Sequence, residues 1–353
     1  MALQCRQVGS GRTIYFRTVI LNGGNVMDIQ LSLGMASNPR TWPIFDGRVK
    51  ADGINLVPSP VHASELFWRQ LKFGDFDVSE MSFSSLIMAQ AAGDNRWVGL
   101  PIFTTRRFFH TGMLIRKDAG IKDPSDLKGK RVGVPEYQQT AALWTRGILQ
   151  HEFGVEPKDM EFFMERVPEQ SHGGSTGFKP PEGVTVNQIP LEKNIGTMML
   201  SGELDATLLY IVDPNLIDRS TADLWNHPDI SSIFPDNRAE GIRYYEKTGI
   251  YPINHGMVIK REIAEEHPWV ILNLMKAFNK ANDIINRERM EHVDYYVETG
   301  LITPDAIRTP LVQHGIRANK LVLETAAQYS FEQGLTPKLA KLEEVFAKNT
   351  MDQ

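Results

Sequence analysis

The chain has 353 residues, of which 42% are hydrophobic and 23% are charged, and its formal net charge is -5 at pH 7. These values are typical of a globular protein long enough for two lobes, and they leave no basic surface for nucleic acid or an anionic membrane. The single cysteine, Cys5, excludes an intramolecular disulfide.

The N-terminal residues lack the features of a secretory signal peptide. Their longest apolar run, Val19-Ile20-Leu21, is too short for the hydrophobic region of such a peptide. We therefore expect residues 1–26 to be a disordered or loosely docked extension and the protein to be cytoplasmic. No apolar run in the sequence approaches the length of a membrane span.

Strands and helices alternate in the first third of the chain. Strands are expected at residues 28–33, 55–58, 76–80, 96–104 and 108–116. Helices are expected at residues 63–73 and 82–92. This alternation favours an α/β fold with mostly parallel sheets and helices on both faces.

The clearest stretch is 122–154. A β-branched strand at 131–134 leads through a loop into a helix at 141–152, for which Thr140 is a good N-cap. A helix N-terminus at the carboxyl edge of a sheet presents free N–H groups and the positive end of the helix dipole, and anions bind there. We therefore expect residues 136–140 to project into a ligand cleft.

The second half of the chain continues the alternation and then becomes helical. The expected strands are 160–167, 206–212 and 249–260, and the expected helices are 191–200, 263–289, 303–308, 317–332 and 338–348. Residues 168–187 are rich in Gly, Pro and Ser and predict a loop, either a lid or a surface excursion, in which His172 would be solvated.

The strand at 249–260 mirrors the strand at 108–116, and this pairing suggests two crossings between lobes. One lobe would comprise residues 27–109 and 255–353, and the other residues 110–254. His110 and His255 stand at the two crossings. We expect both rings at the floor of an interlobe cleft, where small ligands are commonly held.

Several segments carry a resemblance to a known family. They are Phe73–Leu86, Asp123–Gly154, Ser201–Leu208 and Pro252–Ala281. These segments resemble the 4,5-dihydroxyphthalate decarboxylases, which are similar in turn to the type 2 periplasmic solute-binding fold. The likeness extends over about residues 27–345, and Phe109 departs from a position where relatives often have arginine. No metalloprotease, nucleophile-elbow, dinucleotide or nucleotide-phosphate motif occurs in the sequence.

The resemblance implies a non-oxidative decarboxylase of a hydroxylated aromatic dicarboxylic acid, such as 4,5-dihydroxyphthalate. Direct loss of carbon dioxide would leave an unstable aryl carbanion. A hydroxyl group para to the carboxylate permits another route, because its ionisation lets the carboxyl-bearing carbon take a proton before the bond breaks. The site must supply a base, an acid, cations for the carboxylates and apolar walls.

Ten residues are candidates for these tasks. His110 and His255 would be the acid and base, and Glu136 a base, an orienter of a histidine or a metal ligand. Three arginines would clamp carboxylates, because guanidinium groups bind carboxylates through two parallel hydrogen bonds. These arginines are Arg40, Arg107 and Arg146. The remaining candidates for substrate binding are Ser82, Ser84, Tyr137 and Thr140.

Structural roles stay open for each candidate. The histidines could bond only to backbone, Glu136 could be a solvated loop carboxylate, and the hydroxyl groups could merely cap helices. The scheme requires no organic cofactor and leaves a divalent metal open. The expected partner is a small aromatic carboxylate, with no nucleic acid or membrane partner, and assembly into a homo-oligomer stays open. The alternative function is a non-catalytic solute-binding protein for an aromatic or other carboxylate.

Overall fold

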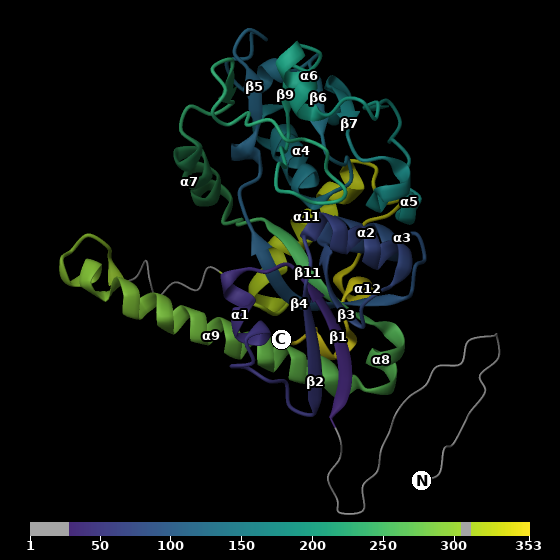
Figure 1. Ribbon diagram of the computed structural model, residues 1–353, viewed down its shortest axis with the longest axis vertical. Coiled ribbons are helices and arrows are strands. Elements are labelled where there is room, and N and C mark those ends of the chain that lie inside the picture. The colour runs from purple at the N-terminus through teal and green to yellow at the C-terminus, as the bar shows by residue number, and fades with distance from the viewer. Residues whose placement is uncertain (1–27, 305–311) are drawn as a thin grey trace, which may run out of the picture.

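The computed structural model describes residues 28–304 and 312–353 and shows two α/β lobes, one above the other (Figure 1). The predicted extension at 1–26 and most of the predicted helix at 303–308 lie outside the described residues. Each lobe is built around one mixed sheet with helices on both sides. The predicted α/β class with an interlobe cleft is therefore confirmed, and five of the nine strand pairs among the described residues are parallel.

The first lobe contains a five-stranded sheet. Its strands, in spatial order, are β2 (Ile54–Pro60), β1 (Ile29–Met35), β3 (Val78–Ser82), β11 (Ile253–Lys260) and β4 (Trp97–Arg106). Strand β11 is antiparallel to both of its neighbours because it returns from the other lobe. One face of the sheet packs on α2 (Ala63–Phe73) and α3 (Phe83–Ala91), and the other on α8 (Arg261–Glu266) and α9 (Pro268–Glu298).

The second lobe contains a six-stranded sheet. Its strands, in spatial order, are β10 (Ile230–Ser232), β5 (Leu114–Arg116), β9 (Ala206–Thr207), β6 (Arg131–Val134), β7 (Glu161–Met164) and β8 (Thr185–Gln188). Its helices are α4 (Thr140–Phe153), α5 (His172–Thr176), α6 (Ile195–Ser201) and α7 (Asn237–Thr248). Helix α4 fills the core beside β6, with every residue from Thr140 to Leu149 buried.

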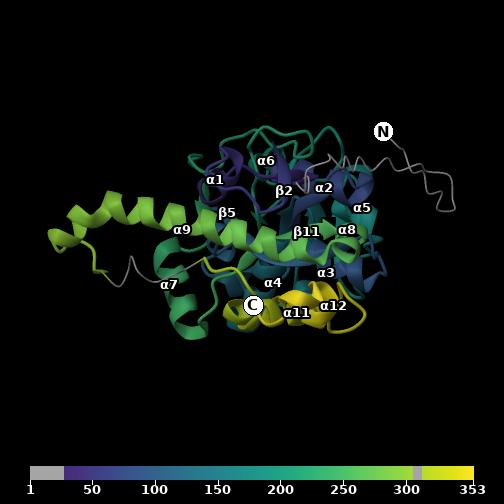
Figure 2. The ribbon, with the colours of Figure 1, turned by 90° about the horizontal axis from the view of Figure 1, so that it is seen from below.

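The C-terminal segment joins the two lobes. Helix α11 (Lys320–Glu332) contacts α3 of the first lobe and α4 of the second. Figure 2 shows α11 and the short helix α12 (Leu342–Val345) running along one side of the molecule, while α9 crosses it. The remaining short helix of the first lobe is α1 (Trp42–Phe45). Helix α11 therefore belongs to the packing of both lobes.

The structure differs from the sequence prediction in two segments near the crossings. The strand predicted at 108–116 is wrong for its first half, because His110–Gly112 form a 3-10 turn and only Leu114–Arg116 pair as a strand. The loop predicted at 168–187 contains helix α5 and the beginning of β8. Its Ser171 hydroxyl accepts a hydrogen bond from the N–H of Gly174, which caps the short helix.

Candidate active site

A cavity of about 280 Å³ lies between the lobes. It is lined by the N-terminal ends of α2 and α4 and by the segments around Arg107, Arg166, Ile211 and His255. Its apolar wall consists of Phe67, Phe109, Leu209 and Ile211. A volume of this size with a few polar groups on an apolar wall fits a small organic ligand.

His255 is held in this cavity by a buried carboxylate. Its Nδ1 lies 2.8 Å from Oε1 of Glu80, which is fully buried on β3. Glu80 also accepts hydrogen bonds from the N–H of Ala36 at 2.8 Å and from the Thr104 hydroxyl. Burial alone would raise the pKa of Glu80, but the bonds from His255, Thr104 and Ala36 hold it below its usual range. Glu80 is thus a carboxylate anion that fixes the His255 ring.

The other side of His255 faces the cavity. Its side chain is 12% exposed, and Nε2 accepts a hydrogen bond at 2.8 Å from the amide nitrogen Nδ2 of Asn254, which also lines the cavity. No lysine or arginine among the described residues pairs with Glu80, so this buried carboxylate depends on the hydrogen bonds from His255, Thr104 and Ala36. The pair therefore holds the Nδ1 proton of the ring and leaves Nε2 on the cavity side.

A second imidazole, His172, lines the same cavity. It is only 1% exposed, its Nδ1 lies 3.0 Å from the Ser85 hydroxyl oxygen, and its Nε2 has no partner among the described residues. The Phe67 ring meets both His172 and His255 edge-on, at centroid distances of 5.7 and 4.7 Å. Two imidazoles therefore flank one aromatic side chain of the cavity wall.

His172 lies next to a buried ionic cluster. Arg166 donates to Oε2 of Glu136 at 3.1 Å, to Oδ1 of Asp218 at 2.7 Å and to the Ser64 hydroxyl at 2.7 Å. Burial lowers the pKa of His172 to about 4, although the nearby Glu136 carboxylate opposes this shift. His172 is therefore a neutral ring at physiological pH.

Arg107 gives the cavity its free positive charge. Its side chain is exposed, it lines the cavity, and its guanidinium group has no hydrogen-bond or ion-pair partner among the described residues. Arg166 also lines the cavity, but its positive charge is shared with two carboxylates. An incoming carboxylate would therefore meet Arg107 first.

The N-terminus of α4 adds a second attraction for anions. Gln139 is the N-cap of this 14-residue helix, and its side chain makes no capping bond to the first-turn N–H groups. The prediction that Thr140 is the N-cap was wrong, because its hydroxyl is within hydrogen-bond distance of Ser82 at 2.9 Å and receives the N–H of Ser84 at 2.9 Å. These bonds join the two lobes at the edge of the cavity.

The structure brings four of the ten predicted site residues to the cavity lining. They are His255, Arg107, Ser82 and Thr140. Ser84 and Glu136 lie behind the lining: Ser84 donates to the carbonyl oxygen of Gln138 at 2.5 Å, and Glu136 bonds to Arg166 and to the N–H of Gly173. Glu136 thus supports the lining rather than forming it.

His110 is not among the residues that line the cavity. Its ring is completely buried, its Nε2 lies 3.0 Å from Oε1 of Glu240, and it packs against Phe108, Phe234 and Tyr244. The expected placement at the cleft floor fails because the chain turns in a 3-10 helix at this crossing and points the ring toward α7.

Arg40, Arg146 and Tyr137 are also absent from the lining. Arg40 donates two hydrogen bonds to the carbonyl oxygen of Thr104, at 3.2 and 2.6 Å. Arg146 is completely buried, with its guanidinium carbon 3.7 Å from the centre of the Tyr137 ring and hydrogen bonds to Gln333 and to the Tyr137 carbonyl. Arg146 therefore joins α4 to the segment after α11.

Sequence reasoning missed Glu80 and assigned His172 to solvent. Glu80 lies in a strand whose five residues are all buried, and a charged residue in such a strand requires a partner. That signal was present in the sequence. The burial of His172 was not, because it depends on α5 packing against α2 and α3.

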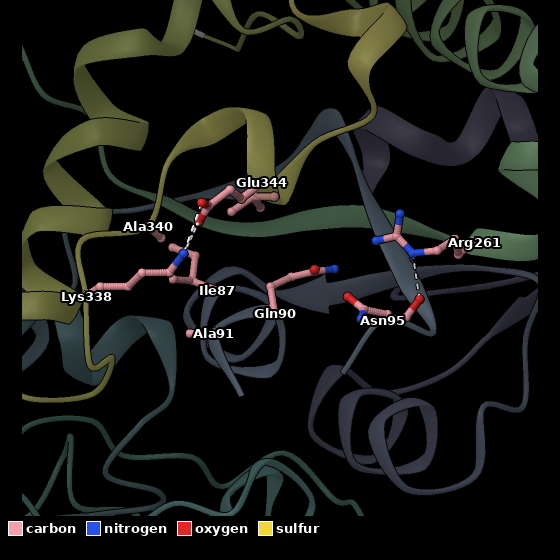
Figure 3. Close-up of a pocket in the computed structure, with 9 residues that line it drawn as sticks. Ile87, Gln90, Ala91, Asn95, Arg261, Lys338, Ala340 and Glu344 are labelled. Atoms are coloured by element: carbon pink, nitrogen blue, oxygen red, sulfur yellow. Dashed lines mark hydrogen bonds and ion pairs between the residues drawn. The ribbon is translucent and has the colours of Figure 1, made fainter. Parts of the chain in front are cut away.

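A larger cavity of about 450 Å³ lies elsewhere, where α3 and the start of α8 face the segment before α12 (Figure 3). Its charged groups already have partners: Lys338 pairs with Glu344 at 3.0 Å, and Arg261 donates to the carbonyl oxygen of Asn95 at 2.7 Å. It contains no histidine and no unpartnered buried polar atom. The interlobe cavity is therefore the better candidate site.

The described residues contain no cluster of three or more His, Cys, Asp or Glu side chains arranged to hold a metal ion. Within the same residues, no helix has both the length and the apolar character needed to cross a membrane.

The fold places the chain among two-lobed binding-protein folds. The alkanesulfonate-binding protein SsuA of Xanthomonas axonopodis pv. citri, solved with bound MOPS, superposes with a TM-score of 0.54 at 14% identity. The alignment covers 92% of this chain and 99% of that protein. A family model described as NMT1/THI5 like matches residues 88–173. The chain therefore has the type 2 periplasmic-binding-protein-like fold.

Sequence similarity identifies the family within this fold. The 4,5-dihydroxyphthalate decarboxylase of Comamonas testosteroni is 33% identical over 256 residues, which cover 72% of this chain and 76% of that enzyme. The enzyme of the same name from Pseudomonas putida is 33% identical over 217 residues, which cover 62% of this chain and 81% of the relative. The chain belongs to the 4,5-dihydroxyphthalate decarboxylase family, so the predicted resemblance and the carboxy-lyase class are confirmed.

Proposed function

We propose that this protein removes carbon dioxide from a hydroxylated aromatic dicarboxylic acid, 4,5-dihydroxyphthalate or a close analogue, without an oxidation step. The main support is one arrangement: a histidine fixed by a buried carboxylate, an unpartnered arginine and an uncapped helix N-terminus around one cavity. The relatives that carry this substrate in their names support the choice of ring.

The substrate carboxylates would be held by Arg107 and by the N-terminus of α4. Arg107 offers paired N–H groups to one carboxylate, and the first-turn amides of α4 offer the positive end of the helix to the other. The aromatic ring would then lie against the apolar wall around Phe67 and Phe109. This wall excludes water from the reacting carbon.

His255 would deliver the proton to the ring carbon. With Glu80 accepting from Nδ1, a second proton on the ring would be carried at Nε2 on the cavity side, with the Asn254 amide turned so that its oxygen, rather than its nitrogen, meets that proton. Electron density from the hydroxyl group para to the departing carboxylate makes that carbon basic enough to take the proton. The carbon–carbon bond then breaks, carbon dioxide leaves, and its electron pair restores the aromatic ring.

This scheme uses side chains alone and requires no organic cofactor. A metal ion that chelates the two hydroxyl groups of the substrate is a separate possibility that a chelator tests directly. A cytoplasmic location remains part of this proposal.

The test is an assay with 4,5-dihydroxyphthalate. Loss of substrate absorbance and release of carbon dioxide are followed with and without a chelator. We expect one carbon dioxide per molecule of substrate, one dihydroxybenzoate product and no dependence on chelator. The His255→Gln variant should bind the substrate with similar affinity and lose turnover.

The solute-binding alternative predicts a different result. The fold of this chain is shared with a sulfonate-binding protein, so tight binding of an aromatic carboxylate without carbon dioxide release would favour a binding function. That result would overturn the decarboxylase proposal.

A further inference from the structure

One residue of the cavity lining has a buried polar atom with no partner among the described residues, and the scheme above does not use it. This atom is Nε2 of His172, and only 1% of that residue is exposed. Leaving a buried polar atom without a hydrogen bond is destabilising. Such an atom in the lining of a ligand cavity points to a group on the ligand.

The surroundings of the ring determine which nitrogen carries the proton. Oε2 of Glu136 lies 3.8 Å from Nδ1, and the Ser85 hydroxyl oxygen lies 3.0 Å from it. A carboxylate near Nδ1 stabilises a proton there, and the Ser85 oxygen can accept the Nδ1–H bond. The neutral ring then has its lone pair at Nε2, which is an acceptor.

The neutral state of the ring has a physical cause in its neighbours. The charged groups around His172 are Glu136, Arg166, Asp218 and His255, and positive and negative charges among them largely cancel. Burial then dominates and lowers the pKa of His172 to about 4. The ring therefore remains an acceptor at neutral pH.

An acceptor in this position discriminates between the polar groups of an aromatic acid. An ionised carboxylate can only accept hydrogen bonds, so it would meet a lone pair at Nε2 and be repelled. A ring hydroxyl can donate, and it satisfies the atom. Arg107 and the N-terminus of α4 donate hydrogen bonds and therefore bind carboxylates rather than hydroxyl groups. Together with His172 they would orient the substrate, with its carboxylates toward Arg107 and α4 and its hydroxyl toward His172.

We propose that His172 is the residue that recognises the ring hydroxyl of the substrate, through a hydrogen bond from that hydroxyl to Nε2. This inference rests on the proposed function and names what its site selects: a phenolic ring rather than an unsubstituted aromatic carboxylate. Acceptance of the hydroxyl hydrogen also raises the electron density that reaches the para carbon.

The test measures binding of ligands that the enzyme does not consume. Calorimetry compares 3,4-dihydroxybenzoate with benzoate, which lacks both hydroxyl groups. We expect the wild-type protein to bind the hydroxylated acid at least about tenfold more tightly, as expected when a buried acceptor loses its donor. In His172→Phe, which keeps a flat ring of similar size, this preference should vanish while affinity for benzoate stays within about twofold of the wild-type value.

Two further variants make the result decisive. His110→Phe is the matched control, because His110 is equally buried and should leave the preference unchanged. Ser85→Ala removes the partner of Nδ1 and should reduce the preference while His172 remains in place, so it decides the question if His172→Phe does not fold. Melting temperatures of all variants report on folding.

The outcomes separate this inference from the proposed function. If the wild-type protein decarboxylates 4,5-dihydroxyphthalate but His172→Phe and Ser85→Ala keep the preference for the hydroxylated ligand, His172 does not recognise the hydroxyl. If the wild-type protein shows the preference and both variants lose it while no carbon dioxide is released, the recognition stands and the decarboxylase proposal fails.

Discussion

Two histidines at the two crossings between the lobes are held by glutamates in nearly the same way. His255 lies 2.8 Å from Glu80, and His110 lies 3.0 Å from Glu240. The pairs differ in what surrounds them. The far side of the His255 ring meets the ligand cavity, whereas the Nδ1 of His110 is sealed among aromatic rings and has no partner among the described residues.

The glutamates also differ in how their charge is balanced. Glu240 pairs with Arg243 through both carboxylate oxygens, at 2.7 and 2.8 Å, so its charge is neutralised without His110. No arginine in residues 28–304 or 312–353 pairs with Glu80, which depends on His255. The comparison teaches that two conditions distinguish a histidine–glutamate pair suited to proton transfer. The glutamate must have no arginine or lysine as a second partner, and the imidazole ring must line the ligand cavity.

The largest effect is expected from Glu80→Gln. A neutral amide cannot stabilise protonated His255 and can donate to Nδ1, which fixes the wrong tautomer, so kcat should fall roughly a thousandfold. Steady-state kinetics with 4,5-dihydroxyphthalate measure the loss. The matched variant Glu240→Gln should keep turnover within about twofold of wild type. Loss of turnover in Glu240→Gln but not in Glu80→Gln would contradict the assignment of a role in the reaction to Glu80 and of a structural role to Glu240.

The next effect concerns Arg107, beside the crossing that His110 occupies. Arg107→Met removes the free positive charge of the cavity and should raise KM roughly a hundredfold with a smaller change in kcat. Its neighbour Arg106 points to the other face and bonds to Asn319 and the Tyr251 carbonyl. Arg106→Met should therefore lower the melting temperature and leave KM unchanged. Equal KM values in the two variants would contradict a carboxylate contact at Arg107.

A third effect, of a substitution at His110, is expected on stability alone. His110→Leu removes the buried bond to Glu240 and should lower the free energy of unfolding by about 2 kcal/mol. Turnover of the folded variant should not change, because His110 does not line the cavity. Urea denaturation and steady-state kinetics on the same preparation measure both quantities. A kcat defect with unchanged stability would assign His110 a role in the reaction.

The smallest effect is a dependence of stability on pH. Burial would raise the pKa of Glu240, but hydrogen bonds from Arg243 and His110 outweigh it and lower that pKa to about 2, below the ordinary value of 4.5. A carboxyl group with a lowered pKa in the folded state stabilises the fold above pH 4.5, and this contribution is lost as the pH falls from 4.5 toward 2.

Thermal unfolding between these pH values tests this dependence. Glu240→Gln should be less stable than wild type at neutral pH, and the two melting curves should converge as the pH approaches 2. The exposed control Glu291→Gln should follow the wild-type profile. A constant difference between Glu240→Gln and wild type at all pH values would show that the pair with His110 and Arg243 does not depend on charge.

Local sequence signals predicted much of the fold. The helix expected at 63–73 is α2, and the strand at 131–134 is β6, because alternation, β-branched residues and a terminal glycine act over a few residues. The same signals failed at His110, where the chain between β4 and β5 turns instead of continuing as a strand. That turn depends on packing against α4 and α7, which are distant in sequence.

The candidate site was predicted in part for the same reason. His255 and Thr140 lie at the ends of clear elements, so their positions at the cleft follow from the topology. Arg146 was misplaced because its position in α4 gives no sign that α11 covers that face of the helix. The roles of all these residues stay predictions until the variants are measured.

The packing of α11 against α4 limits how the second lobe can be exchanged between related proteins. At Gly147 an added Cβ atom would lie 2.0 Å from the Tyr329 ring, and Trp144 and Arg146 also contact residues 329 and 333. A fragment ending at residue 254 would expose this surface of α4 to water. Chimaeras that exchange the second lobe between relatives should therefore take residues 320–334 from the same parent as that lobe.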